Sequence, residues 1–131
     1  MKRDVTVWID HREAVFATLT DKGEATSRLE SNVEKHVRFS AAAEHGAEDQ
    51  YERRYEGHLR KYFDAVISRI RDAEAILILG PGEAKHQLEK RLREEGLGGR
   101  IVAVVTTDKM THPQIAARAR QQFLRKESDP A

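Results

Sequence analysis

The beginning of the chain alternates between apolar and polar positions. Residues 5–9 place Val or Ile at every second position, and residues 14–19 are again rich in β-prone side chains after the polar stretch 10–13. This pattern predicts two strands joined by a tight hairpin connection. A turn signal at 21–23 and a weaker alternation over residues 24–30 predict a third antiparallel strand, so we expect a three-stranded meander.

Helical spacing and continuous apolar runs follow. From about residue 50 to residue 72 the apolar positions predict an amphipathic helix of roughly six turns with one stripe toward the core. That stripe consists of Tyr55, Leu59, Phe63, Val66, Ile67 and Ile70. The runs 75–79 and 101–105 are typical of strands covered on both faces. We expect a helix after each run, the first with Pro81 in its first turn and the second opening with a Thr111 cap and a Gln three residues on.

The predicted element order is therefore β-β-β-α-β-α-β-α. Helical connections between the later strands imply parallel pairing with right-handed crossovers. This order predicts an α/β protein with a ribonuclease H-like mixed five-stranded sheet and flanking helices. The 131 residues fit one domain over residues 1–126, with a long mobile loop over 31–49, where periodicity disappears, and a frayed tail over 127–131.

Composition indicates a soluble, heavily ionised protein. Charged residues make up 34% of the chain and aromatic residues 6%, so the core must be built mainly from aliphatic side chains. The 23 Lys and Arg nearly balance 22 Asp and Glu, so a nucleic-acid partner is indicated only if basic residues segregate locally. Cysteine is absent, which excludes disulfides, and charges interrupt the first apolar stretch, so neither a signal peptide nor a membrane span is predicted. We expect a cytoplasmic location.

A nuclease site is incomplete in this sequence. In a fold of this order, carboxylates on the first strand, first helix and fourth strand would hold two divalent metals. Asp10 ends the first predicted strand, but the fourth ends Leu79-Gly80 without a carboxylate, so a two-metal site lacks a ligand. We interpret Asp10 as a turn residue that bonds to its own backbone. No two of the six histidines have i, i+4 spacing on one helix, so we predict no metal and no cofactor.

Basic residues do segregate locally on the first predicted helix. Arg53, Arg54, Arg60 and Lys61 stand at i, i+7 and i+8 spacings, near a loop that also contains basic residues. Such a stripe can track a phosphate backbone. The alternative is a solvated helix face, because carboxylates are interleaved at Glu48, Asp49, Glu52 and Glu56. Composition alone leaves the two interpretations equal.

A second candidate anion site is the stretch Gly80-Pro81-Gly82-Glu83-Ala84-Lys85, at a strand-to-helix junction. Helix N-termini favour anions, and Lys85 adds positive charge. The stretch is neither a Walker motif nor a dinucleotide fingerprint, and Glu83 opposes an anion in the first turn. We favour a structural turn, with a phosphate contact as the alternative.

Several short motifs, in a common order, resemble one family. They are Asp10-His11-Arg12-Glu13-Ala14 between two strands, Lys35-His36 before the loop, and Gly80-Pro81-Gly82 with Lys85 after the fourth strand. Together they resemble the middle domain of archaeal and eukaryotic class I peptide-chain release factors and of Pelota, over about residues 5–123. This resemblance implies the ribonuclease H-like fold. The chain is also similar to stand-alone bacterial relatives labelled translational machinery proteins or host attachment proteins, the latter through Thr107-Asp108-Lys109-Met110-Thr111-His112.

The catalytic tripeptide of the release factors is degenerate here. In that family a Gly-Gly-Gln tripeptide enters the peptidyl-transferase centre and helps water attack the peptidyl-tRNA ester. The best local match is His45-Gly46-Ala47-Glu48-Asp49-Gln50, in which only Gln50 takes the functional position. Glu48 and Asp49 replace glycines and bring bulk and like charge toward RNA phosphate. The resemblance therefore implies a non-catalytic domain, and Gln50 is the catalytic candidate if any exists.

These observations predict a translation-associated domain that binds the ribosome, rRNA or tRNA, directly or beside a protein partner. The expected RNA-binding residues are Lys35, His36, Arg38, His45, Arg53, Arg54, Arg60, Lys61 and Lys85. Two alternatives stay open: a peptidyl-tRNA ester hydrolase that uses Gln50, and a protein-interaction module of the host-attachment type. The sequence does not predict the oligomeric state.

Overall fold

The computed structural model describes residues 2–31 and 48–128, with the side chains of 48–52 and 125–128 outside that description. The predicted element order and α/β class are confirmed. The elements are β1 (Arg3–Ile9), β2 (Glu13–Thr20), β3 (Gly23–Glu30), α2 (Glu48–Ile70), β4 (Ala75–Gly80), α3 (Ala84–Glu94), the short 3-10 helix η1 (Gly98–Arg100), β5 (Ile101–Thr106) and α4 (His112–Ser128).

The sheet has five strands in the order β3-β2-β1-β4-β5. Strands β1, β2 and β3 form the predicted antiparallel meander, while β4 runs parallel to β1 and β5 parallel to β4. The β1–β2 connection is closed by Asp10, whose Oδ1 accepts hydrogen bonds from the backbone N–H groups of Arg12 and Glu13, each at 2.8 Å. The interpretation of Asp10 as a turn residue is therefore confirmed.

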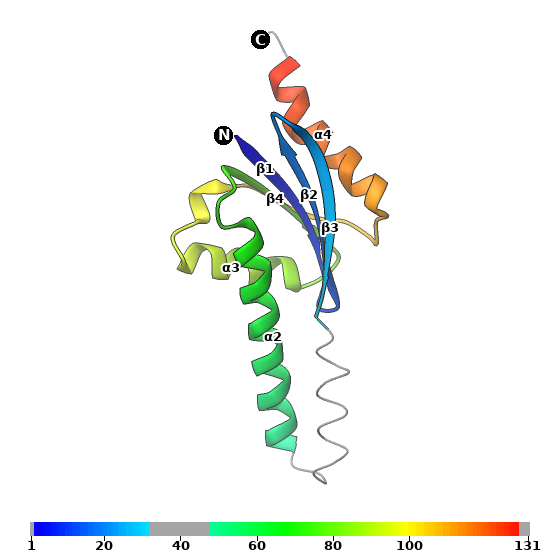
Figure 1. Cartoon of the computed structure of the whole chain (residues 1–131). Helices are drawn as coiled ribbons and strands as arrows, with labels where there is room; N and C mark the ends of the chain where they lie inside the picture. Colours follow the sequence, from blue (N-terminus) through cyan, green and yellow to red (C-terminus); the bar gives the residue numbers. More distant parts are fainter. Residues whose placement is uncertain (1, 32–47, 129–131) are drawn as a thin grey trace.

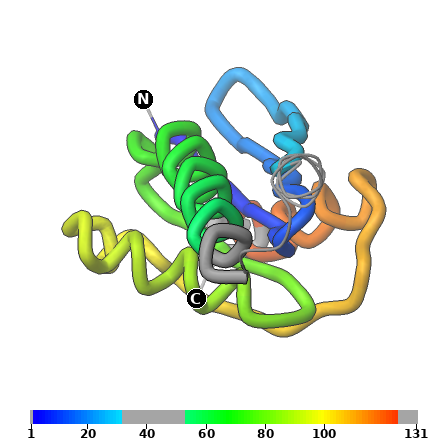
Figure 2. Tube along the Cα trace, turned by 90° about the horizontal axis from the view of Figure 1, so that it is seen from below, coloured from blue at the N-terminus to red at the C-terminus, as the bar shows by residue number. Residues whose placement is uncertain are grey.

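Helices cover both faces of this sheet (Figure 1). Helices α2 and α3 pack on one face, against side chains such as Val5, Val7 and Phe16, and α4 packs on the other, against Trp8 and Val15. Alternate residues of β1 and β2 therefore enter two different cores, as the period of two in a strand requires. The view along the sheet in Figure 2 shows α2 and α4 on opposite sides of the strands.

The helix boundaries differ from the prediction at several points. Helix α3 begins at Ala84, so the expectation that Pro81 lies in its first turn is wrong. The backbone N–H groups of His86 and Gln87 both donate to the Glu83 carbonyl at 3.0 Å, which makes Glu83 the N-cap residue. Helix α4 continues to Ser128, beyond the predicted end at residue 126.

The predicted cap of α4 is present. The Gln114 side chain accepts a hydrogen bond from the Thr111 N–H at 2.8 Å, and the Thr111 hydroxyl accepts one from the Gln114 N–H at 3.2 Å. This reciprocal pair is a capping box, which satisfies backbone donors that a helix N-terminus otherwise leaves free. The start of α4 is therefore firmly positioned beside the end of β5.

Candidate nucleic-acid interface

The basic stripe predicted from the sequence lies on the half of α2 that extends past the sheet. Figure 1 shows the N-terminal half of this helix projecting beyond the ends of β1, β2 and β3. Residues 53–61 are exposed or half-buried, whereas Tyr62 and Phe63 are buried and begin the part of α2 that packs on the sheet. Arg53, Arg60 and Lys61 are exposed and Arg54 is half-buried, so all four basic side chains lie on the projecting half.

Helix α2 is held to the β1–β2 connection where the projection starts. The Tyr62 hydroxyl donates a hydrogen bond to the Asp10 carbonyl at 3.0 Å. Burial raises the pKa of Tyr62 well above the ordinary tyrosine value, and the carboxylates of Asp10 and Glu13 act in the same direction. The phenol is therefore a neutral donor throughout the physiological range. The neighbouring Phe63 meets the His11 ring edge-on, with centroids 6.4 Å apart.

The end of β3 is joined to the same hairpin connection. Ser31 donates its backbone N–H to the Arg12 carbonyl at 2.8 Å and its hydroxyl to the His11 carbonyl at 2.6 Å. Residue 31 and the start of α2 at Glu48 therefore bracket the segment that contains four further predicted RNA contacts. Those residues, Lys35, His36, Arg38 and His45, lie outside the described part of the chain.

Gln50 belongs to the first turn of α2, together with Glu48 and Asp49. The tripeptide aligned with Gly-Gly-Gln is thus part of a helix backbone, although these side chains lie outside the described ones. Paired glycines in a loop permit backbone angles that a helical turn does not use.

The described carboxylates do not neutralise the C-terminal end of the basic stripe. Among the side chains that the structure describes, Arg60 and Lys61 form no ion pair with Asp or Glu. Asp64, one turn further along α2, pairs instead with Arg91 of α3. Glu48, Asp49 and Glu52, three of the four carboxylates named in the solvated-face interpretation, have side chains outside the described ones, so that interpretation and the phosphate-tracking one both stay predictions.

Lys85 does not join this surface. It is 3% exposed, and its ammonium donates a hydrogen bond to the Gly82 carbonyl at 2.7 Å. A Cβ added at Gly80 would stand 2.3 Å from the Ile9 carbonyl oxygen, so the strand end has room only for glycine there. The structural-turn interpretation of residues 80–85 is supported, and the prediction of Lys85 as a surface contact for RNA is wrong, because its charge is turned inward.

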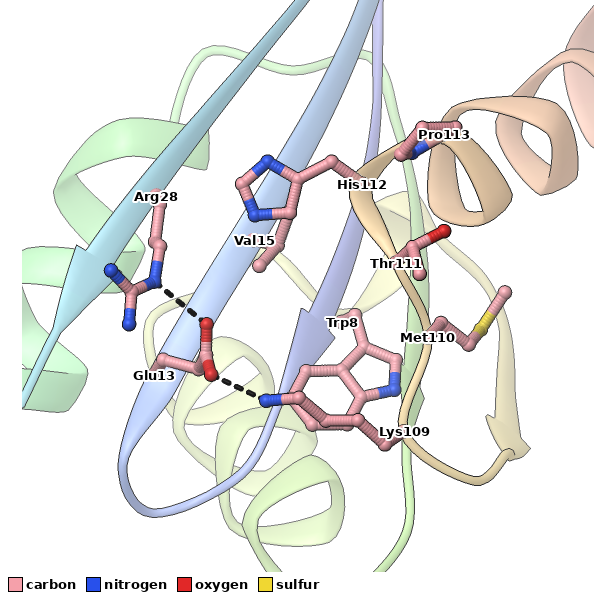
Figure 3. A pocket seen from close by; sticks show the side chains of 9 residues that line it. All are labelled: Trp8, Glu13, Val15, Arg28, Lys109, Met110, Thr111, His112 and Pro113. Atoms are coloured by element: carbon pink, nitrogen blue, oxygen red, sulfur yellow. Dashed lines mark hydrogen bonds and ion pairs between the residues drawn. The ribbon is translucent and has the colours of Figure 1, made fainter.

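A second cluster of charged residues surrounds a pocket that the sequence did not indicate. Figure 3 shows Glu13 between two cations: its Oε1 accepts from Arg28 Nε at 2.8 Å, and its Oε2 accepts from Lys109 Nζ at 2.5 Å. The Lys109 ammonium also lies 4.9 Å from the centre of the Trp8 ring. Glu13 and Lys109 belong to two of the motif segments, 10–14 and 107–112, which are distant in the sequence and adjacent in the fold.

The pocket has a volume of about 570 Å³ and is lined on its apolar side by Trp8, Val15, Met110 and Pro113. The Lys109 ammonium lowers the pKa of Glu13 below its ordinary value; burial opposes this shift and Arg28 adds to it. Glu13 is therefore ionised and has both oxygens occupied. Its ion pair with Lys109 links the β1–β2 hairpin to the loop before α4. Neither oxygen of the Glu13 carboxylate is free to act as a general base.

Two other features, a metal cluster and a membrane-spanning helix, are absent from the part of the chain that the structure describes. The described residues contain no group of three His, Cys, Asp or Glu side chains arranged to hold a metal ion. None of the described helices combines the length and apolar content needed to cross a bilayer.

The mixed sheet with helices on both faces defines an α/β domain of the ribonuclease H-like kind. No protein-family model matches the sequence, and no curated protein matches it. Among solved structures, the chain is similar to the Pelota protein of Thermoplasma acidophilum (14% identity, TM-score 0.56, covering 96% of this chain and 42% of that one). It is also similar to Pelota of Archaeoglobus fulgidus (15% identity, TM-score 0.59, covering 95% and 32%).

A third similar structure is the archaeal translation termination factor aRF1 (12% identity, TM-score 0.53, covering 95% of this chain and 40% of that one). The chain therefore spans less than half the length of each of these proteins. The resemblance inferred from short motifs is confirmed at the level of the fold. At such identities the comparison establishes the fold, and function must be argued from the surface of this chain.

Proposed function

We propose that this protein is a translation-associated domain that binds RNA on the ribosome through the projecting half of α2, without catalysing ester hydrolysis. The similarity of its fold to Pelota and to a translation termination factor supports this proposal. The proposal places the protein in the cytoplasm and keeps Lys35, His36, Arg38 and His45 as expected contacts beside the α2 stripe.

The observation that carries the proposal is the placement of Arg53, Arg54, Arg60 and Lys61 on one projecting helix segment whose residues are exposed or half-buried. Cations that meet phosphates release condensed counterions, and this release drives much of the affinity of proteins for nucleic acids. A helix that projects beyond the body of the domain can bring these charges into a groove of RNA. The rest of the domain then serves as a rigid support.

The proposal assigns no catalytic role to Gln50. Glu48 and Asp49 precede it in the chain, and their charge opposes approach to the phosphates of a tRNA end. Substitution of Gln50 is therefore expected to leave ribosome binding and any release of peptide from charged tRNA unchanged.

Co-sedimentation with purified ribosomes over a range of salt concentrations tests the proposal. Wild-type binding should weaken as salt rises, and Arg53→Glu combined with Arg60→Glu should weaken binding and reduce the slope of log affinity against log salt by about two. Stability should change by less than about 0.5 kcal/mol, because both side chains are exposed.

A control with the same change in net charge is Lys22→Glu combined with Arg118→Glu. Lys22 lies in the β2–β3 turn and Arg118 on α4, away from the projecting half of α2. This variant should bind nearly as the wild type does. Equal weakening by both double variants would show that only overall charge matters and would refute the assignment of α2.

A further inference from the structure

Gly57 occupies the middle of the basic stripe on α2. Arg53 and Arg54 precede it by one helical turn, and Arg60 and Lys61 follow it by one turn. The first and last cations, Arg53 and Lys61, are separated along the axis by slightly more than two turns, or roughly 12 Å. Glycine is the poorest helix former after proline, because it loses the most backbone freedom on folding. Its presence inside a continuous helix therefore needs a reason.

The described structure supplies no internal reason for this glycine. Its backbone is helical, and it is not among the glycines with a positive φ, which are Gly23 and Gly96. A Cβ added at Gly57 would meet no described atom within 4 Å. This differs from Gly80, where a Cβ would collide with the Ile9 carbonyl. Alanine at position 57 would therefore meet no obstacle in the described part of the chain and would favour the helix.

Because glycine has no side chain, position 57 leaves room on the outside of the helix. Among the described residues, the space that a Cβ of Gly57 would fill is open, and this open position, here called the notch, has one pair of cations on either side along the axis. A phosphodiester backbone carries the charge that complements these cations. The notch would let one strand lie close enough for both pairs to contact its phosphates.

We propose that Gly57 is a positioning residue for RNA, which admits the phosphodiester backbone against α2 between the Arg53–Arg54 pair and the Arg60–Lys61 pair. This inference rests on the proposed function, and it specifies the point of closest approach. It leads to an unusual combination for one substitution: Gly57→Ala should raise the thermal stability of the protein and weaken its binding to RNA.

The experiment measures the melting temperature and the affinity for purified ribosomes, by co-sedimentation at a fixed low salt concentration. Gly57→Ala is expected to raise Tm and to weaken binding about tenfold, the size expected for losing one charge-assisted contact. Gly57→Leu, with a larger side chain of good helix propensity, should weaken binding further. The control is Ser68→Ala, an exposed position on the part of α2 that packs on the sheet, which should leave binding unchanged.

The outcomes separate this inference from the function on which it rests. If Gly57→Ala binds like the wild type while Arg53→Glu with Arg60→Glu binds weakly, the positioning role of Gly57 is refuted. The assignment of RNA binding to the projecting half of α2 is then retained. A lower Tm for Gly57→Ala would also refute the positioning role, by showing that the protein's own fold requires the glycine. If the wild type shows no salt-sensitive binding to ribosomes, both the inference and the proposed function are overturned.

Discussion

The two halves of α2 share one continuous helical backbone and have opposite surroundings. From Tyr62 to Ile70 the helix buries an apolar stripe against the sheet, and Ile67 in this half is fully buried. From Arg53 to Lys61 no side chain is buried, and four are basic. The first half of the helix is thus less buried against the sheet than the second half, and its basic side chains lie at or near the surface.

A pair of truncations, one in each half, should show the largest effect on stability. Ile67→Ala removes buried atoms from the core between α2 and the sheet, and we expect it to lower the free energy of unfolding by about 2–5 kcal/mol. Leu59→Ala, in the half-buried region before the core, should cost about 1 kcal/mol or less. Chemical denaturation measures both, and equal losses would contradict the division of the helix.

A smaller effect is expected at the boundary between the halves. Tyr62→Phe removes the hydrogen bond to the Asp10 carbonyl, and we expect a loss of about 1 kcal/mol at neutral pH. Ribosome binding should weaken only slightly, because the basic residues themselves are unchanged. Chemical denaturation and co-sedimentation of the same variant measure the two quantities.

The stability of Tyr62→Phe should also differ from that of the wild type in its dependence on high pH. The folded state raises the pKa of Tyr62, so the folded protein binds this proton more tightly than the unfolded chain does. The resulting stabilisation is complete below the unfolded pKa of about 10 and is lost as the pH rises further toward the folded value. Above pH of about 10 the wild type should therefore lose stability more steeply than Tyr62→Phe. Parallel curves would contradict the buried environment of the phenol.

Elements that depend on a local sequence signal were predicted correctly, but such a signal does not give the extent of the buried face. The alternation in β1 and β2, the apolar runs of β4 and β5, and the capping box at Thr111 all depend on neighbouring residues. Helical periodicity also identified the buried face of α2. It could not show how far the sheet extends beneath that face: Leu59 packs at the edge of the core, and Tyr55, one turn before it, is also only half-buried.

Interactions between distant residues were not predictable in the same way. Glu13 and Lys109 are separated by 96 positions, and their contact follows only from the arrangement of β2 beside the loop before α4. The inward turn of Lys85 is a local contact with the Gly82 carbonyl, three residues earlier, but the sequence does not show that the side chain folds back onto this turn. The sequence of a lysine beside a turn motif does not show whether its ammonium faces RNA or a carbonyl of the protein itself.

Crosslinking from α2 tests the central claim most directly. The chain contains no cysteine, so Glu56→Cys introduces a unique thiol on an exposed position between the two cation pairs, and Gln121→Cys provides a matched position on α4. Each variant, labelled with a thiol-linked photoreactive group, is irradiated with ribosomes, and adducts to RNA are quantified. We predict abundant RNA adducts from position 56 and few from position 121. Equal or greater RNA labelling from position 121, or only protein adducts from position 56, would contradict the account.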